Sequence, residues 1–280
     1  MKKIFLATLI ISSLINAEGM PDTYKLSLGT YLTGDFNSAT QIGNNNGVSV
    51  DLDLQDIFNM DTDLASLYID GYYRFNPRHR IEVGYKSTKS SGQSNTAFTV
   101  GGNIIQDINI TAGVNAHYNL AVSKLMYTYS FFHQDNMEVG ISAGIYYAQF
   151  DLGFGAKVEK IGGDFAFKVA QGLPVVGARM DYTINPQWHV LYAFDIFALG
   201  GDLNVESETS DNVLKKFDGY MSDFTLSTEY RLYENFALGG SFNYAAQDFS
   251  IVLENAVQED YKLGITNSII GFAIYGTLFF

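Results

Sequence analysis

The run of residues that ends the chain at Phe280 constrains the fold most, because it alternates between two kinds of side chain. One parity is apolar and mostly bulky: Ile270, Phe272, Ile274, Gly276, Leu278 and Phe280. The other is smaller and carries the polar atoms: Ile269, Gly271, Ala273, Tyr275, Thr277 and Phe279. A period of two places these sets on opposite faces of a β-strand. A soluble sheet buries its apolar face in a core, whereas a membrane barrel turns it towards lipid.

The first 17 residues have the pattern of a secretory signal peptide. Lys2 and Lys3 follow the initial methionine, and an apolar segment of twelve residues, 4–15, precedes Ala17. This segment is short for a membrane helix, so a retained anchor is the weaker alternative. We expect cleavage after Ala17, which leaves residues 18–280 as one mature domain.

Composition narrows the possible functions. The absence of cysteine excludes disulfides, a thiolate nucleophile and cysteine-ligated metals. Without the signal peptide, 15 Lys and Arg residues face 30 Asp and Glu residues, which argues against nucleic acid as a partner. The 19 Tyr, 21 Phe and 27 Gly residues suit strands joined by tight turns.

Four short turn signals divide the chain at nearly even intervals, at 76–79, 133–136, 185–187 and 233–235. Asn, Pro and Asp favour tight turns, and short turns that alternate with longer connections are typical of outer-membrane barrels. The expected strands are 24–35, 64–75, 80–90, 115–132, 137–151, 173–184, 188–199, 218–232, 236–247 and 268–280. We therefore predict an all-β, antiparallel up-and-down transmembrane β-barrel of about ten strands. Eight or twelve stay open, because residues 47–54 also alternate and would form a loop hairpin or a wall strand.

Charged residues fall on the less apolar face of the expected strands, as they would if that face lined a polar lumen. The predicted lumen charges are the cations Arg74, Arg80, Lys86, Lys124, Arg179 and Arg231 and the anions Asp70, Glu82, Glu138, Asp181, Asp195, Asp223 and Glu229. Six cations against seven anions favour a cross-linked ion-pair network over a selectivity ring of one sign. A weakly selective narrow pore is the alternative. Ten strands enclose little more than the interior that side chains fill in an eight-stranded barrel, which argues against a wide pore.

Aromatic residues gather beside the turn signals and predict a membrane-interface girdle at that end of the barrel. They are Tyr73, Phe75, Tyr129, Phe131, Tyr182, Trp188, Tyr230, Phe236 and Phe280. Two other interpretations remain. The aromatic residues would also suit a soluble β-sandwich core, and the uncharged residues 263–280 would suit a membrane helix.

Catalytic and metal-binding signals are weak. His117 is the one histidine placed to act as a base near the outer end of a strand, but no Ser-His-acid arrangement accompanies it. Asp51, Asp53, Asp56, Asp61 and Asp63 form an acidic segment without the EF-hand spacing, so we interpret residues 51–63 as a solvated loop. We expect no cofactor, no resident metal and no enzymatic activity. An outer-leaflet lipid hydrolase or acyltransferase is the alternative, and bridging to lipopolysaccharide through divalent cations is a further option for the acidic loop.

The segment from Tyr73 to Glu82, which reads YRFNPRHRIE, resembles the first turn of a group of uncharacterised proteobacterial outer-membrane β-barrels. The segments 173–177 and 229–231 resemble the same group, and the likeness to OmpW-like and OmpA-like small barrels is more distant. The closing strand with its terminal aromatic also resembles the signal that the barrel-assembly machinery reads. The resemblance implies a barrel fold and a location in the cell outer membrane. We expect a monomer in contact with the lipid and lipopolysaccharide of that membrane and with the barrel-assembly machinery. We expect a structural or narrow-transport role, with a porin-like channel as the alternative.

Overall fold

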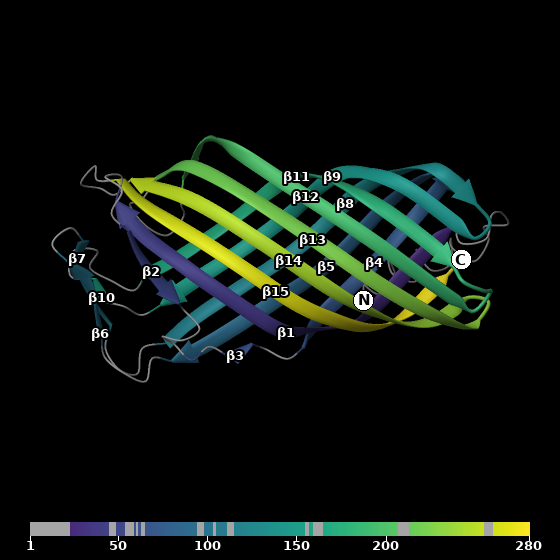
Figure 1. Cartoon of the computed structure of the whole chain (residues 1–280), viewed down its shortest axis with the longest axis horizontal. Coiled ribbons are helices and arrows are strands. Elements are labelled where there is room, and N and C mark those ends of the chain that lie inside the picture. The colour runs from purple at the N-terminus through teal and green to yellow at the C-terminus, as the bar shows by residue number, and fades with distance from the viewer. Residues whose placement is uncertain are drawn as a thin grey trace, which may run out of the picture.

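The computed structural model describes residues 23–44, 49–53, 59, 61–62, 65–93, 98–102, 105–110, 115–154, 157–158, 165–206, 213–254 and 260–280. The predicted signal peptide lies outside these residues. Ten strands form the wall of a closed antiparallel β-barrel (Figure 1). They are β1 (Tyr24–Asn44), β4 (Ser66–Asn76), β5 (His79–Gln93), β8 (Asn115–Gln134), β9 (Met137–Phe154), β11 (Phe165–Thr183), β12 (Trp188–Glu206), β13 (Val213–Tyr233), β14 (Phe236–Glu254) and β15 (Asp260–Phe279).

The barrel closes where β15 pairs with β1. The register runs from Lys25 opposite Phe279 to Asn44 opposite Tyr261, with one irregularity between Thr33 and Asp35. Closure leaves no open edge in the wall, so the backbone polar groups of the first and last strands satisfy each other. The predicted ten-stranded up-and-down barrel is therefore confirmed, and the alternatives of eight or twelve wall strands are wrong.

The two ends of the barrel differ. One end, here called the turn end, carries the four tight turns and the last residue of the chain. At the opposite end, the loop end, the wall strands continue beyond the predicted ranges. There β2 (Ser49–Asp53) pairs with β1, β3 (Asp61–Thr62) pairs with β5, and β6 (Phe98–Gly102), β7 (Ile105–Ile110) and β10 (Lys157–Val158) form a small separate sheet (Figure 1). Residues 49–53 thus belong to a loop hairpin rather than to the wall.

Strand β15 has the two faces that its sequence predicts. Phe272 and Ile274 are 46% and 67% exposed on the outside, whereas Ala273 and Tyr275 are buried inside. The interpretation of residues 263–280 as a membrane helix is therefore wrong, because this segment is a strand paired on both sides. Within the part of the chain that the structure describes, no helix has the length and apolar character needed to cross a membrane.

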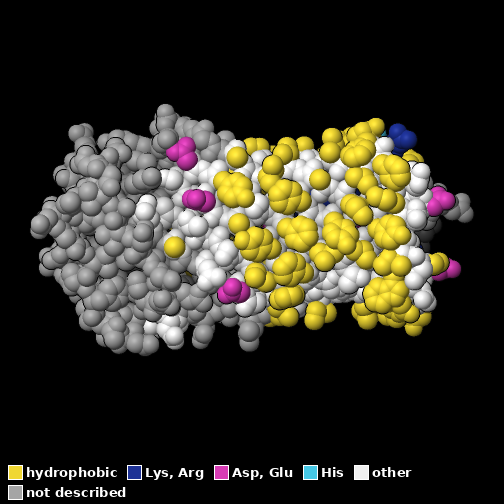
Figure 2. All heavy atoms as spheres, in the orientation of Figure 1, with side chains coloured by type: hydrophobic (Ala, Val, Ile, Leu, Met, Phe, Trp, Pro, Cys, Tyr) yellow, Lys and Arg dark blue, Asp and Glu magenta, His cyan; other side chains and the backbone are white. Residues whose placement is uncertain are grey.

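An apolar band covers the outer face of the barrel next to the turn end. Figure 2 shows it as a continuous belt of hydrophobic side chains, with acidic side chains beyond both of its margins. All ten wall strands contribute large exposed apolar side chains to this band. Those of β5 and β8 include Ile81, Val83, Leu125 and Tyr127. A soluble sandwich would bury such a surface, so the structure contradicts the soluble alternative in which these aromatic residues form a core.

Candidate functional site

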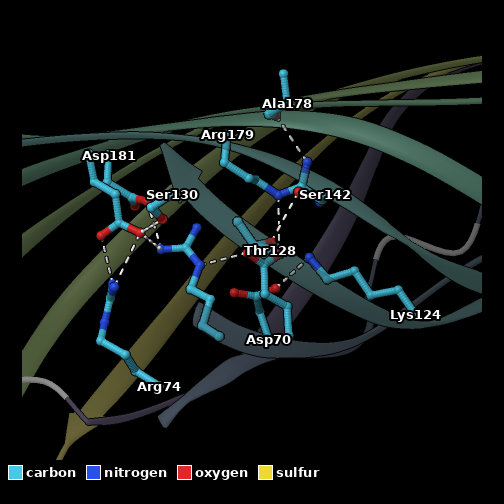
Figure 3. A network of polar contacts seen from close by, with 12 residues as sticks. Asp70, Arg74, Lys124, Thr128, Ser130, Ser142, Ala178, Arg179 and Asp181 are labelled. Atoms are coloured by element: carbon cyan, nitrogen blue, oxygen red, sulfur yellow. Dashed lines mark hydrogen bonds and ion pairs between the residues drawn. The ribbon is translucent and has the colours of Figure 1, made fainter. Parts of the chain in front are cut away.

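The predicted lumen charges all project into the barrel and cluster in its turn-end half. Arg179 holds Asp195 through two bonds of 2.7 and 2.9 Å, and its Nε donates to Glu82 at 3.1 Å. Arg80 contacts the other Glu82 oxygen at 2.7 Å and Asp181 at 2.8 Å. Glu82, which is buried, is therefore shared by two guanidinium groups from β5 and β11. Figure 3 shows part of this network, including Arg179 and Asp181.

The network extends towards the tight turns through Glu138. Arg74 contacts its two oxygens at 3.2 and 2.7 Å and also donates to the Pro77 carbonyl at 2.7 Å. Ser130 donates to Glu138, and Arg80 approaches the same carboxylate at 3.5 Å. Two guanidinium groups and one hydroxyl thus surround one buried carboxylate, which is the condition under which a buried charge is tolerated.

Two further ion pairs lie deeper in the barrel. Lys124 contacts Asp70 at 2.7 Å (Figure 3). Lys86 contacts Asp223 and also donates to Asn243 at 2.8 Å. Asn243 donates to Asp223 at 2.9 Å and accepts from the Tyr31 hydroxyl at 3.1 Å, so Asp223 has charged and neutral donors. These contacts tie β1, β5, β13 and β14 together across the lumen.

The sequence analysis missed one member of the lumen charges, Lys25. Its Nζ lies 2.6 Å from Glu229, and both side chains are buried. The exposed neighbours Leu26 and Leu28 share the opposite parity and could have placed Lys25 on the inner face. With Lys25 included, the lumen charges named above contain seven cations and seven anions, so the turn-end half is balanced.

Two residues lie at the rim of the lumen near the tight turns, and one of them is the predicted lumen charge Arg231. Arg231 lies over the Phe279 ring, 4.3 Å from its centroid, at the mouth of the turn end. His189, next to the third turn, lies 3.5 Å from Asp181 and 3.1 Å from the Thr183 hydroxyl. Both residues line an open vestibule of about 550 Å³ at this end.

The loop-end half of the lumen is mostly apolar, which the prediction of a polar, charged lumen did not anticipate. Its large buried side chains come from six strands and include Tyr118, Leu120, Phe150, Leu173, Phe197, Met221, Ile265 and Ile269. The Tyr118 and Phe150 rings meet edge to face at 5.1 Å. On β11, β12 and β15 these residues alternate with outward residues that are also apolar or weakly polar, such as Pro174, Ile196 and Thr266. Alternation alone therefore does not reveal the two faces of those strands.

Little space remains between the two halves. An internal cavity of about 60 Å³ lies among the charged residues and is lined by Arg80, Lys86, Asp195 and Tyr146. A smaller cavity of about 20 Å³ lies on its loop-end side, beside Leu120 and Met221. Buried waters would fit in such spaces, but a hydrated solute would not.

Among the residues that the structure describes, three buried acceptor atoms have no hydrogen-bond partner: Glu229 Oε2, Gln247 Oε1 and Asn267 Oδ1. Gln247 and Asn267 face each other across β14 and β15, within the apolar half. The Asn267 amide donates to the Tyr118 hydroxyl at 3.0 Å, whereas Gln247 only approaches the Met221 sulfur, at 3.9 Å. An unsatisfied buried acceptor has an energetic cost, so this pair is a weak point of the apolar half.

The predicted girdle residues lie on the outer face at the turn end. Tyr24 stacks on Tyr73 with centroids 4.7 Å apart, and Trp188 packs against Tyr230 at 5.0 Å. Phe280 lies beside Tyr24 through two backbone hydrogen bonds, and Phe236 is paired with Leu278. Phe75, Phe131 and Tyr182 are exposed, and Tyr129 is half-buried beside His79.

The structure gives His117 a partner. Its Nε2 lies 3.1 Å from Asp151 on β9, and the histidine is exposed on the outer face near the loop end. Asn115, Asn119 and Ser123 share its strand face, and Ser91 lies opposite it on β5. Nucleophilic catalysis requires a hydroxyl hydrogen-bonded to the histidine, and among the described residues none is hydrogen-bonded to His117.

In the acidic segment 51–63, all of the acidic side chains lie outside the described residues. Among the described residues, no group of three or more His, Asp or Glu side chains has a metal-binding arrangement.

Comparison with known proteins bears on the fold. No protein-family model and no curated protein matches the sequence. Among solved structures, the outer-membrane protease OmpT of Escherichia coli matches with a TM-score of 0.58 and 13% identity, over 94% of this chain and 99% of OmpT. The outer-membrane protein OprG of Pseudomonas aeruginosa matches with a TM-score of 0.42 and 12% identity, over 92% of this chain and 95% of OprG. The likeness to OmpT agrees with the resemblance to outer-membrane barrels, and at this identity it concerns the fold alone.

Proposed function

We propose that the chain is an integral outer-membrane protein whose sealed barrel is a rigid scaffold for the segments at its loop end. The apolar band supports insertion into a bilayer, because exposing Phe272, Ile274 and their neighbours to water would be unfavourable. The closed wall supports the same conclusion, since hydrocarbon tolerates only backbones that are fully hydrogen-bonded. The export signal and the terminal Phe280 fit delivery to the outer membrane through the assembly machinery.

The filled lumen is the observation that favours a scaffold over a channel. Balanced ion pairs cross the turn-end half, apolar side chains fill the other half, and the cavity among the charged residues is about 60 Å³. An ion entering this space would have to replace hydrogen bonds that the buried charges make with one another. The role of the protein would then lie with the outer segments that the barrel holds above the membrane.

Single-channel recording in planar lipid bilayers tests the sealed lumen. We expect no steady conductance from the wild-type barrel once heat-modifiable gel mobility has shown that it is folded. The double variant Leu120→Ala, Phe197→Ala removes two apolar side chains from the loop-end half and should produce openings. Regular ohmic steps from the wild type would overturn the sealed scaffold.

Narrow transport is the second candidate, and the vestibule at the turn end favours it. The vestibule of about 550 Å³ and the small internal cavity share Tyr72, Arg80 and Asp181 in their walls. The Arg80 side chain therefore lies between an open mouth and the inner space. If Arg80 is a gate, Arg80→Ala should increase solute flux into vesicles, whereas Arg231→Ala, at the rim of the vestibule, should leave flux unchanged.

The alternative of an outer-leaflet lipid enzyme has its own test. Mass spectrometry of lipid A from cells with the wild-type protein and with His117→Ala compares the products directly. Identical spectra are expected for the scaffold, and a product that disappears with the histidine would favour the enzyme.

A further inference from the structure

An apolar groove of about 530 Å³ runs across the outer face of β8, β9, β11 and β12. Its walls include Tyr127, Tyr129, Ile141 and Phe194, and its floor includes the small side chains Ala143 and Ala178. In the pairing register, Tyr129, Ile141, Ala178 and Phe194 form one row across the four strands, and Tyr127 and Ala143 belong to the next row. The two alanines are therefore diagonal neighbours, and they leave a hollow between bulkier side chains.

The groove has a polar margin at the turn end. His79 Nδ1 lies 2.6 Å from the Tyr127 hydroxyl, and its ring packs against Tyr129 with centroids 5.2 Å apart. Arg78, the residue before it, is exposed, and its carbonyl accepts from the Ser130 amide at 2.8 Å, which fixes the turn beside β8. Arg78 is also the one Lys or Arg in the four tight-turn segments of the sequence.

We propose that this groove, with Arg78 and His79 at its end, binds one glycerophospholipid from the leaflet on the turn-end side. An acyl chain would lie over Ala143 and Ala178, and the phosphate would face the Arg78 guanidinium. The site rests on the proposed membrane location, because it needs headgroups at the level of the aromatic girdle. Charge complementarity gives the site a preference for an anionic headgroup.

A second copy of the chain fits this surface less well. Two barrels inserted in the same direction would pair about an axis along the membrane normal, with the same patch on both sides. The Arg78 residues of both copies would then lie at the same height beside one interface, where like charges repel. A phospholipid instead supplies an apolar tail for the groove and an anionic phosphate at the level of Arg78.

Native mass spectrometry of the detergent-purified barrel, after incubation with phosphatidylglycerol or phosphatidylethanolamine, tests the site. We expect one retained lipid per wild-type barrel, with phosphatidylglycerol preferred. The variant Ala143→Leu, Ala178→Leu fills the groove and should weaken retention roughly tenfold, a change of one decade in Kd. Ala198→Leu, at an exposed alanine of β12 outside the groove, is the matched control and should retain lipid like the wild type.

Arg78→Gln separates headgroup from tail recognition. It should remove the preference for phosphatidylglycerol while some lipid of either kind is still retained. Equal retention by the wild type and the groove-filled variant would overturn the site, and so would a dimer in the wild type that the groove-filled variant loses. Heat-modifiable mobility in every variant shows that the barrel itself is intact, so a lost lipid is distinguishable from a failure of the barrel to form.

Discussion

The two halves of the lumen are both filled, but they are filled by opposite means. In the turn-end half, Arg80, Glu82 and Arg179 form part of a network in which each buried charge has partners of opposite sign. In the loop-end half, Tyr118, Phe197 and Ile265 fill the space without charge. The charged half lies next to the open vestibule and depends on complete sets of partners, whereas the apolar half depends on volume. The halves should therefore respond differently to single substitutions.

The largest effect is expected where one buried carboxylate is shared by two buried cations. Glu82→Gln leaves Arg80 and Arg179 facing each other without their shared carboxylate, and should destabilise the barrel by about 3–5 kcal/mol. Urea unfolding followed by fluorescence of Trp188, the one tryptophan of the chain, measures the change. Asp248→Asn, at an exposed acid on β14, is the matched control and should stay within about 0.5 kcal/mol. A loss below about 1 kcal/mol at Glu82 would mean that the network contributes little to stability.

A substitution on the outer face should have the next largest effect on stability. Its cost can be compared with the costs of the substitutions in the two halves of the lumen. Phe272→Arg places a charge in the apolar band and should cost about 2–4 kcal/mol if this position faces hydrocarbon. Tyr233→Arg, at the turn end where that side chain is 71% exposed, should cost only about 0–1 kcal/mol. Folding into vesicles with urea titration compares the pair. Equal costs would reverse the assignment of the outward face.

A smaller effect is expected from volume in the apolar half. Ile265→Val removes one methylene from a buried position and should cost about 0.5–1.5 kcal/mol. Ile274→Val on the same strand points outward, where lipid fills the space left behind, and should be nearly neutral. The same unfolding assay distinguishes the two variants. An unchanged free energy of unfolding in Ile265→Val would indicate a loosely packed interior.

The smallest effect is expected from two amides on β14, and its sign differs between the halves. Gln247→Leu removes an unsatisfied acceptor from apolar surroundings and should stabilise the barrel by up to about 1 kcal/mol. Asn243→Leu, four residues away along the strand and nearer the charged half, removes bonds to Asp223, Lys86 and Tyr31 and should destabilise it. Destabilisation by both substitutions would show that Gln247 has a partner, such as a buried water.

The sequence allowed the barrel, its strand number and its charged interior to be predicted, for a physical reason. Near the tight turns, Asp223 and Glu229 alternate with Phe224 and Tyr230, so hydropathy with a period of two distinguishes the faces. Lys25 was not predicted, although Leu26 and Leu28 mark the opposite face, because it is the second residue of β1 and only the residues after it show the alternation. Which cation meets which anion depends on strands far apart in sequence, as Lys86 and Asp223 show.

The apolar half of the lumen could not be predicted from the pattern. Leu173 and Phe197 point inward, but Val176 and Ile196 point outward, and all four are apolar. The groove over Ala143 and Ala178 was equally hidden, because it arises from the register of four strands and not from any segment alone.

The central claim is that a closed cylinder meets lipid with its apolar outer face, and folding of residues 18–280 into detergent-free lipid vesicles tests it most directly. The account predicts that the chain floats with the vesicles on a density gradient and migrates faster on a gel before boiling than after it. A chain that remains in the aqueous fraction as a folded monomer, with the same mobility before and after boiling, would contradict it.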